Sequence, residues 1–280
     1  MQTILEILNK TSGYFQSKGI ENAKGDAQIL LAEVLGCKRL DLFLRFEEPL
    51  AGAALDKYRD FVRRRAKREP LQHIIGKCDF FGVQLKCDAR ALIPRPETEY
   101  LCELIADKYL CRDGAAAFSI LDLGTGTGAI AIALKNRFKN ASVLGVDASA
   151  DALALARENA ELAGAEVEFA QSDWFAGAAG KFDLIVANPP YLSEEEVAAA
   201  QPEVREFDPR RALAAEENGL ADLRKILAAA PAHLNAGGLI ACECGVGQPA
   251  QLMAEFGGNY VEFIAADDLS RRSRYVFARV

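Results

Sequence analysis

The spacing of apolar residues divides the chain into two parts with different periods. Up to about residue 75, apolar side chains recur three and four positions apart, which is typical of amphipathic helices. The segments 27–35 and 55–68 show this spacing, and they are followed by residues that stop helices, Gly36 and Pro70. We therefore predict a small helical domain over residues 1–77.

A different pattern begins at residue 78. Residues 78–93 mix aromatic, β-branched and turn-forming side chains, which favours a β-hairpin that links two domains. The following segment, Ile93–Glu99, holds two prolines that exclude the interior of a helix and indicate a rigid loop. A helix that runs toward Tyr109 is expected to start at Glu97 or Thr98.

From residue 118 onward, strand-like and helix-like stretches alternate, and residues 94–280 are predicted to form one domain. Helices are expected at 129–138, 150–162 and 220–234. Short apolar runs predict strands at 119–123, 142–146, 167–170, 184–187, 239–243, 261–265 and 274–278. This alternation predicts an α/β fold, in which a mostly parallel sheet is covered on both faces by helices.

The composition argues against several kinds of partner. The formal net charge is −7, whereas a dedicated nucleic-acid binder usually presents a basic face. The one basic run, 63–68, is either a solvated helix face or a docking surface for an acidic partner or RNA. No apolar stretch approaches the roughly 18 residues of a membrane span, so no membrane association is expected.

Potential metal ligands are scarce and irregularly spaced. The chain has seven cysteines without a regular spacing and only two histidines, so no metal site is expected. Cys242 and Cys244 alternate within an apolar run, and we interpret them as buried, reduced thiols on one face of a strand. Reduced thiols of this kind indicate a cytoplasmic location.

A glycine-rich segment follows the first predicted strand of the α/β domain. Gly124-Thr125-Gly126-Thr127-Gly128 lies between strand 119–123 and a helix, the usual ligand site of open α/β sheets. Glycines permit a tight turn and the close approach of a ligand. Asp147 ends the second strand, where its carboxylate can accept both hydroxyl protons of a ribose. The pattern predicts a nucleoside site, although the glycines could also serve only a tight turn.

Two further residues extend this predicted site. Asp173 follows the third strand and could accept a hydrogen bond from an adenine amino group. Trp174, the single tryptophan of the chain, could pack against a purine or a substrate. A helix cap and a core aromatic are the structural alternatives. The glycine spacing differs from the Gly-x-Gly-x-x-Gly of dinucleotide sites, which argues against a nicotinamide oxidoreductase.

The most specific motif is Asn188-Pro189-Pro190-Tyr191, which follows the strand 184–187. A planar nitrogen in an amide or aromatic amine is a poor nucleophile because its lone pair is delocalised. The side-chain oxygen of Asn188 and the carbonyl of Pro189 could hold its N–H groups and favour the positive charge that develops during methylation. The ring of Tyr191 could pack on the flat target group, and Pro190 stiffens the loop.

Together, the glycine segment, Asp147 and the Asn-Pro-Pro-Tyr motif resemble class I methyltransferases that act on planar nitrogens. Ile93-Pro94-Arg95-Pro96-Glu97-Thr98-Glu99 resembles the signature of HemK-type release factor glutamine methyltransferases. Two more stretches are similar to that family. They are Pro70–Gly76 with Phe80–Gly82, and Glu243–Gln248.

The resemblance implies a function and a set of partners. The helical domain would grip a class I peptide-chain release factor, and the methyl group of S-adenosylmethionine would pass to the glutamine of its Gly-Gly-Gln motif, with S-adenosylhomocysteine as product. By matching position, Gly124–Gly128, Asp147, Trp174 and Asn188 would line the cofactor, and Asn188–Tyr191 would hold the glutamine. A cytoplasmic monomer is expected.

Alternatives and one departure remain open. A ribosomal-protein glutamine or an exocyclic base amine of nucleic acid could be the acceptor instead, and a binding module without activity is a further alternative. The family often shows Gly-Gly-x-Asp-Gly-Leu after Pro-Arg-x-Ala-Leu. Here Pro209–Leu213 is followed by Ala214–Leu220, which lacks two of those glycines and the aspartate, so the shape of this loop is left open.

Overall fold

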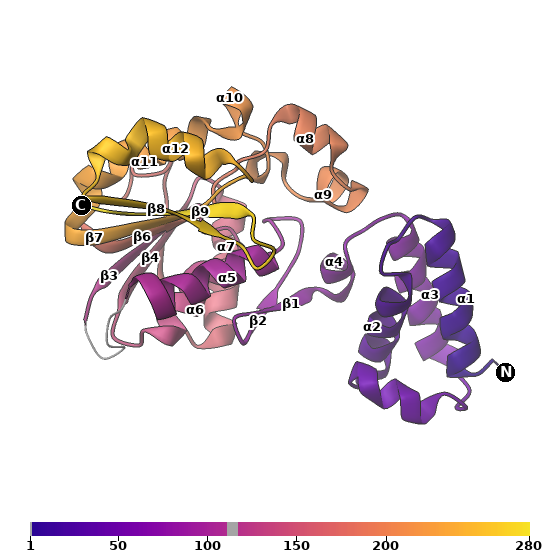
Figure 1. Cartoon of the computed structure of the whole chain (residues 1–280). Coiled ribbons are helices and arrows are strands. Elements are labelled where there is room, and N and C mark those ends of the chain that lie inside the picture. Colours follow the sequence, from indigo (N-terminus) through magenta and orange to yellow (C-terminus); the bar gives the residue numbers. More distant parts are fainter. Residues whose placement is uncertain (1, 111–116) are drawn as a thin grey trace. The chain divides into compact units, whose positions relative to one another are not determined.

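The computed structural model describes residues 2–110 and 117–280, and Cys111 lies outside the described residues. The chain forms two compact units (Figure 1). One comprises the residues up to Gly76 together with Gln201–Phe207, and the other comprises Lys77–Ala200 and Asp208–Val280. The predicted division at residue 77 did not anticipate that residues 201–207 pack with the N-terminal helices.

The first unit is helical, and its longest helices surround an apolar core. A capping box of Thr3 and Glu6 starts the first helix, and Gly36 in a left-handed conformation ends the second. Phe15, Leu30 and Leu42 lie fully buried between them. The elements are α1 (Ile4–Ser17), α2 (Ala23–Leu35), η1 (Arg39–Arg45), α3 (Gly52–Ala66), α4 (Leu71–Ile75) and α9 (Pro202–Phe207).

The basic run at the end of α3 is mostly engaged in ion pairs within this unit. Arg65 is buried and pairs with Asp26 at 2.8 Å and with Glu203 of α9 at 2.8 Å. Glu203 also pairs with Arg68 at 2.6 Å, which explains why α9 belongs to the helical unit. Three arginines of the run, at positions 63, 64 and 68, pair with Asp60, Glu69 and Glu203, respectively.

The second unit begins with the predicted hairpin, which is confirmed. Strands β1 (Lys77–Phe80) and β2 (Val83–Lys86) pair antiparallel. The proline-rich loop then leads into α5 (Pro96–Leu104), with a proline in its first turn, and α5 continues into a single π-helical turn, η2 (Ile105–Tyr109).

A seven-stranded sheet forms the centre of this unit, in the order β5-β4-β3-β6-β7-β9-β8. The first five strands of this order are parallel, and β9 is antiparallel to both of its neighbours. The prediction of a mostly parallel α/β sheet is confirmed. The strands are β3 (Ser119–Leu123), β4 (Ser142–Asp147), β5 (Glu168–Gln171), β6 (Phe182–Ala187), β7 (Leu234–Glu243), β8 (Glu262–Asp267) and β9 (Ser273–Arg279).

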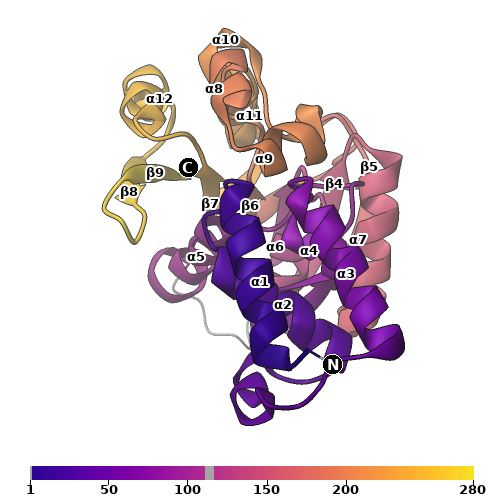
Figure 2. The same ribbon diagram turned by 90° about the vertical axis from the view of Figure 1, so that its right-hand side faces the viewer.

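Helices cover both faces of the sheet, as Figures 1 and 2 show. On one face α5, α6 (Ala129–Arg137) and α7 (Ala150–Ala163) lie over the sheet, and Leu134 and Phe138 are fully buried there. On the other face lie α11 (Ala221–His233) and α12 (Gln248–Phe256). In the described part of the chain, no helix is long and apolar enough to cross a membrane.

Several short elements were not predicted from the sequence. These are α4, η1, α8 (Glu194–Ala199), α9, η3 (Arg210–Ala212), α10 (Glu216–Gly219), η4 (Gly257–Asn259) and the longer α12. Most span fewer than two helical turns, too short for an apolar period to be read from the sequence. Strand β7 also starts earlier than expected, at Leu234, which pairs with Phe182 before a register shift.

Candidate active site

A cavity of about 290 Å³ lies where β3, β4, β5 and β6 end, at the carboxyl edge of the sheet. The strand order reverses here, since β4 and β6 lie on opposite sides of β3. Most of the residues predicted for the site line this cavity: Gly124, Thr125, Gly126, Thr127, Asp147, Asp173, Trp174, Asn188 and Pro190. Gly128, Pro189 and Tyr191 do not line it, although they adjoin residues that do.

The glycine segment forms a tight turn between β3 and α6. Gly124 and Gly126 have φ values of +71° and +55°, which residues with a Cβ rarely adopt. The buried carboxylate of Asp122 holds this turn, because its Oδ2 accepts hydrogen bonds from Thr125 Oγ1 at 2.6 Å and from the Ala131 amide at 3.2 Å. Burial raises the pKa of Asp122 to about 7.

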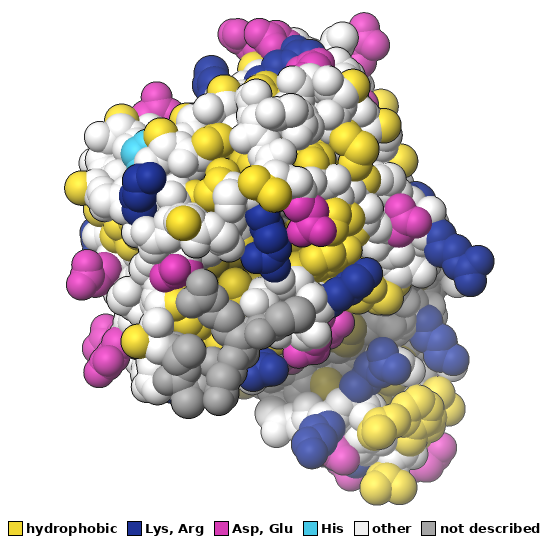
Figure 3. Space-filling model, turned by 60° about the vertical axis from the view of Figure 1, so that its left-hand side comes forward, with side chains coloured by type: hydrophobic (Ala, Val, Ile, Leu, Met, Phe, Trp, Pro, Cys, Tyr) yellow, Lys and Arg dark blue, Asp and Glu magenta, His cyan; other side chains and the backbone are white. Residues whose placement is uncertain are grey.

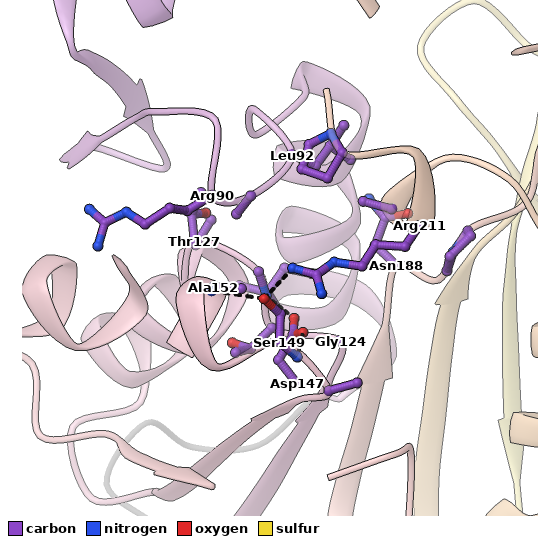
Figure 4. A pocket seen from close by; sticks show the side chains of 18 of the residues that line it. Arg90, Leu92, Gly124, Thr127, Asp147, Ser149, Ala152, Asn188 and Arg211 are labelled. Atoms are coloured by element: carbon purple, nitrogen blue, oxygen red, sulfur yellow. Dashed lines mark hydrogen bonds between the residues drawn. The ribbon is translucent and has the colours of Figure 1, made fainter. Parts of the chain in front are cut away.

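Asp147 connects the second strand to this turn. Its Oδ2 accepts a hydrogen bond from the Gly126 amide at 2.9 Å, and its Oδ1 accepts one from the Ser149 amide at 2.8 Å. A carboxylate has about four acceptor positions, so both oxygens can still accept from a diol. Figure 4 shows the guanidinium of Arg211 reaching the Ser149 hydroxyl beside Asp147.

The Trp174 indole is held against the glycine turn. A Cβ placed on Gly124 would lie 3.4 Å from the indole ring, an ordinary contact distance, so the ring packs directly against the turn. The indole Nε1 donates to Asp222 Oδ1 at 3.3 Å. Trp174 has φ +47°, a strained conformation for a bulky residue that concentrates at functional sites. Asp173 next to it is exposed.

The Asn188–Tyr191 loop is supported by hydrogen bonds to one buried carboxylate. Asn188 Nδ2 donates to Thr98 Oγ1 at 2.9 Å, and the Thr98 hydroxyl donates to Glu243 Oε2 at 2.7 Å. The Tyr191 hydroxyl donates to Glu243 Oε1 at 2.9 Å. Glu243 is 0% exposed, and burial raises its pKa, opposed by these two hydroxyl donors. Burial also raises the pKa of Tyr191, so its hydroxyl stays a donor.

The far end of the same loop is fixed by α12 and α10. Gln248 Nε2 donates to the Tyr191 carbonyl at 3.0 Å, while Gln248 Oε1 accepts from the Gly245 amide at 2.7 Å. Gly219 packs so closely that a Cβ there would lie 2.0 Å from the Tyr191 carbonyl oxygen. The loop is therefore held at both ends by residues from four other elements, α5, β7, α10 and α12.

The altered segment after Leu213 keeps a defined shape. Leu192 and Ala214 form a parallel bridge, and the Ala215 amide donates to the Leu192 carbonyl at 3.0 Å. Glu217 and Asn218 take left-handed conformations, both with φ 56°, before Gly219 restores the close approach to Tyr191. The replaced residues thus lie beside the retained glycine that the loop requires.

Several residues that shape this site were not assigned from the sequence. Asp222 and Arg211 line the cavity, and Thr98, Glu243 and Gln248 support the Asn188–Tyr191 loop. The last three lie in the two segments that carry the family resemblance, Ile93–Glu99 and Glu243–Gln248, so that resemblance was the available signal. Nothing in their own spacing indicates that they meet.

The donor and acceptor groups fit a nucleoside-based methyl donor. A glycine turn that permits close approach, a carboxylate with free acceptor positions and a fixed indole line one cavity. The sheet order and this site define a class I methyltransferase. The family model described as "Methyltransferase small domain" matches residues 101–205, and the one described as "PrmC N-terminal domain" matches residues 6–76.

Curated relatives cover the whole chain. The protein named release factor glutamine methyltransferase from Geobacter sulfurreducens is 40% identical over 280 residues, 99% of this chain and 97% of that protein. Its namesake from Deinococcus radiodurans is 40% identical over 274 residues, 98% of this chain and 97% of that protein. This chain belongs to the release factor glutamine methyltransferase family.

A solved structure shows the shared fold at lower identity. The Thermus thermophilus 16S rRNA methyltransferase in complex with AdoMet and guanosine aligns with a TM-score of 0.52 and 19% identity. The alignment covers 72% of this chain and 49% of that one. At this identity the likeness concerns the fold alone.

Proposed function

We propose that this enzyme transfers a methyl group from S-adenosylmethionine to the side-chain amide nitrogen of the glutamine in the Gly-Gly-Gln motif of a class I release factor. The observation that carries the proposal is the orientation of Asn188. Its Nδ2 is bonded to Thr98, so its Oδ1 is the end left for a ligand in the cavity that Gly124 and Asp147 also line. The names of the curated relatives support the acceptor.

The residues that would hold the cofactor lie on the first three strand ends. The glycine turn would receive it closely, Asp147 would accept from its ribose hydroxyls, and Trp174 and Asp173 would border its adenine. When bound, S-adenosylmethionine supplies an electrophilic methyl group on sulfur, and S-adenosylhomocysteine remains after the transfer. Asn188 and Pro190 line the same cavity as these residues, so the cofactor and the glutamine would meet there.

The chemistry asked of the Asn188–Tyr191 loop is to make a planar amide nitrogen react. Asn188 Oδ1 and the Pro189 carbonyl would accept from the two N–H groups of the glutamine and favour positive charge on its nitrogen. The nitrogen lone pair forms the new N–C bond while the S–C electron pair returns to sulfur. The methylated nitrogen then loses one proton to water, which leaves a neutral N-methyl amide.

The helical unit would dock the release factor, and the enzyme would act as a monomer in the cytoplasm. The match of residues 6–76 to the N-terminal domain model of this family supports the docking role. The described cysteines are free thiols, and both Cys242 and Cys244 are fully buried, which fits a reducing compartment.

Nucleic acid and ribosomal protein are the acceptors that the test must separate from a release factor. Four arginines of the basic run 63–68 are each paired with a carboxylate, which weakens the argument for phosphate binding there. On the face that Figure 3 shows, the Lys and Arg side chains of the described residues lie among Asp and Glu side chains.

The decisive experiment uses methyl-tritiated S-adenosylmethionine. The acceptors are a purified class I release factor and the same factor with its Gly-Gly-Gln glutamine changed to alanine. We expect label in the first and none in the second. Equal label in both would place the methyl group elsewhere on the factor. No label in either, from an enzyme that binds the cofactor, would overturn the proposed acceptor and make ribosomal protein and RNA the next substrates to test.

A further inference from the structure

Hydrogen bonds from Asn188 to Thr98 and from Thr98 to Glu243 fix the direction in which Asn188 presents its carboxamide. We infer that Thr98 and Glu243 are positioning residues, which keep the Asn188 oxygen turned toward the substrate. The inference rests on the proposed function for its kinetic test and on geometry alone for its spectroscopic test.

The carboxylate of Glu243 is the fixed end of this series of hydrogen bonds. It is fully buried, and each of its oxygens meets one hydroxyl, from Thr98 at 2.7 Å and from Tyr191 at 2.9 Å. An ionised carboxylate has no proton to donate and can only accept. Burial raises the pKa of this carboxylate, whereas the two hydroxyl donors and Arg274 lower it, and the ionised form is the one in which each oxygen accepts from one hydroxyl. Both hydroxyl protons are therefore directed at Glu243.

Thr98 has a single hydroxyl proton. Because that proton is given to Glu243, Thr98 Oγ1 can only accept at its contact with Asn188. The partner 2.9 Å away must then be the Asn188 nitrogen, and the opposite end of the carboxamide must be its oxygen. This assignment follows from the direction of the protons, which is how the orientation of an amide is decided.

The orientation of the Asn188 carboxamide matters because the proposed substrate also carries a carboxamide. An oxygen at Asn188 accepts from the glutamine N–H group, whereas a reversed amide would set two N–H donors against each other. Reversal would also leave the buried Glu243 oxygen without the Thr98 proton, which is costly for a charged group. The Thr98–Glu243 pair therefore selects the acceptor orientation before the substrate arrives.

The variants for the test change the side chains of Thr98 and Glu243. Thr98→Val removes the hydroxyl and keeps the branched shape, and Thr98→Ser restores the hydroxyl. Glu243→Gln keeps the size, but its amide can donate to Thr98 and so reverse the direction of this series of hydrogen bonds. A matched control is Thr11→Val, which removes another buried threonine hydroxyl, in the helical unit.

We expect Thr98→Val and Glu243→Gln to lower kcat for the release factor by about 10-fold to 100-fold, the scale of one lost buried hydrogen bond. Affinity for S-adenosylmethionine should change little. Thr98→Ser should recover most of the turnover, and Thr11→Val should match the wild type. Turnover of Thr98→Val and Glu243→Gln within about twofold of the wild type would overturn the inference.

The orientation of the Asn188 carboxamide can be tested with a release factor whose target glutamine is changed to glutamate. An acceptor at Asn188 repels a carboxylate, so the wild-type enzyme should bind the glutamine form more tightly than the glutamate form. Glu243→Gln should reduce this preference, because its Asn188 can turn a donor outward. An unchanged preference in Glu243→Gln would contradict the role of Glu243, whatever its effect on fold stability.

A nuclear magnetic resonance measurement needs no acceptor and separates this inference from the proposed function. In ¹⁵N-labelled enzyme with S-adenosylhomocysteine, one Asn188 Nδ2 proton should be shifted downfield by its bond to Thr98. The shift should vanish in Thr98→Val and persist in Thr98→Ser. If the shift is the same in Thr98→Val, the positioning role fails. If the wild type labels no release factor, the proposed function fails instead.

Discussion

The two halves of the proposed active site, one for the cofactor and one for the substrate, are held in place by different means. In the cofactor half, Asp122 fixes a residue three positions away and Asp147 receives the amide of Gly126, 21 positions away. In the substrate half, Asn188 bonds to Thr98, 90 positions away, and Tyr191 bonds to Glu243, 52 positions away. Contacts of shorter range build the glycine turn of the first half, although its Trp174 is held by Asp222, 48 positions away, whereas the second half exists only after α5, β7 and α12 have packed together.

This difference implies that the halves can be damaged separately. Substitutions in the glycine turn should act on cofactor affinity, and substitutions around Asn188 should act on turnover. Any variant that affects both equally would show that the two halves are coupled through the cavity they share.

The largest effect is expected from Asn188→Ala. It removes an acceptor that is proposed to favour charge on the reacting nitrogen, so kcat should fall by about 10²-fold or more. The affinity for S-adenosylmethionine, measured by calorimetry, should change far less. Normal turnover in this variant would remove Asn188 from the mechanism, and an equal loss of both quantities would break the separation of the halves.

Asp147→Ala should show the reverse pattern. The substitution removes the proposed ribose acceptor and also the bonds that hold the Gly126 and Ser149 amides at 2.9 Å and 2.8 Å. We expect cofactor affinity to fall by about 10-fold to 100-fold, the scale of one or two lost hydrogen bonds to a charged group. With saturating cofactor, kcat should stay near the wild-type value. Unchanged affinity by calorimetry would exclude Asp147 from the site.

Gly219→Ala tests whether the distant support of the substrate half matters. The new Cβ would lie 2.0 Å from the Tyr191 carbonyl oxygen, so the end of the Asn188–Tyr191 loop must move. A drop in kcat of about 10-fold is expected, with unchanged cofactor affinity, because small displacements of a positioned group are costly.

Gly180→Ala is the matched control for this substitution. Gly180 has a similar left-handed conformation, with φ +97°, but no atom lies within 4 Å of the position of its Cβ. It should lose stability from backbone strain alone and keep its turnover. If both variants lose turnover alike, backbone strain rather than the contact with Tyr191 is responsible.

The same contrast explains what the sequence could predict. The strand 119–123 and the helix that follows it were predicted almost to the residue, and the ligand turn between them follows from a general rule for α/β sheets. The class of fold and the Asn188–Tyr191 motif were equally accessible, since each depends on a short continuous segment.

The supporting residues could not be predicted because their partners are far apart in the chain. Thr98 looks like an ordinary residue of a helix start, and Glu243 looks like a charged end of a buried strand. Their meeting depends on how α5 packs over β7, which no local period encodes. The capture of residues 201–207 by the helical unit is a similar case, because it depends on Arg65 and Arg68 reaching Glu203.

The smallest effect is expected for the contribution of Asp122 to the free energy of unfolding, which depends on pH. Burial raises the pKa of Asp122 from 3.8 to about 7. Between pH 3.8 and about 7, Asp122 is protonated in the folded protein and ionised in the unfolded chain. Stability must then fall as pH rises through this window, at most by about 1.4 kcal/mol per pH unit. Asp122→Asn cannot titrate and provides the reference.

Denaturant unfolding of both proteins at pH 5, 6 and 7 measures this contribution. The free energy of unfolding of the wild type, taken relative to that of Asp122→Asn, should decrease from pH 5 to pH 7. No change over this range would mean that Asp122 is already ionised in the folded protein at pH 5, because Thr125 and Ala131, which donate to it, stabilise its charge at least as much as burial opposes it. The glycine turn would then be supported by an ionised carboxylate throughout this range, and the difference between the two halves would lie only in the distance of their partners along the chain.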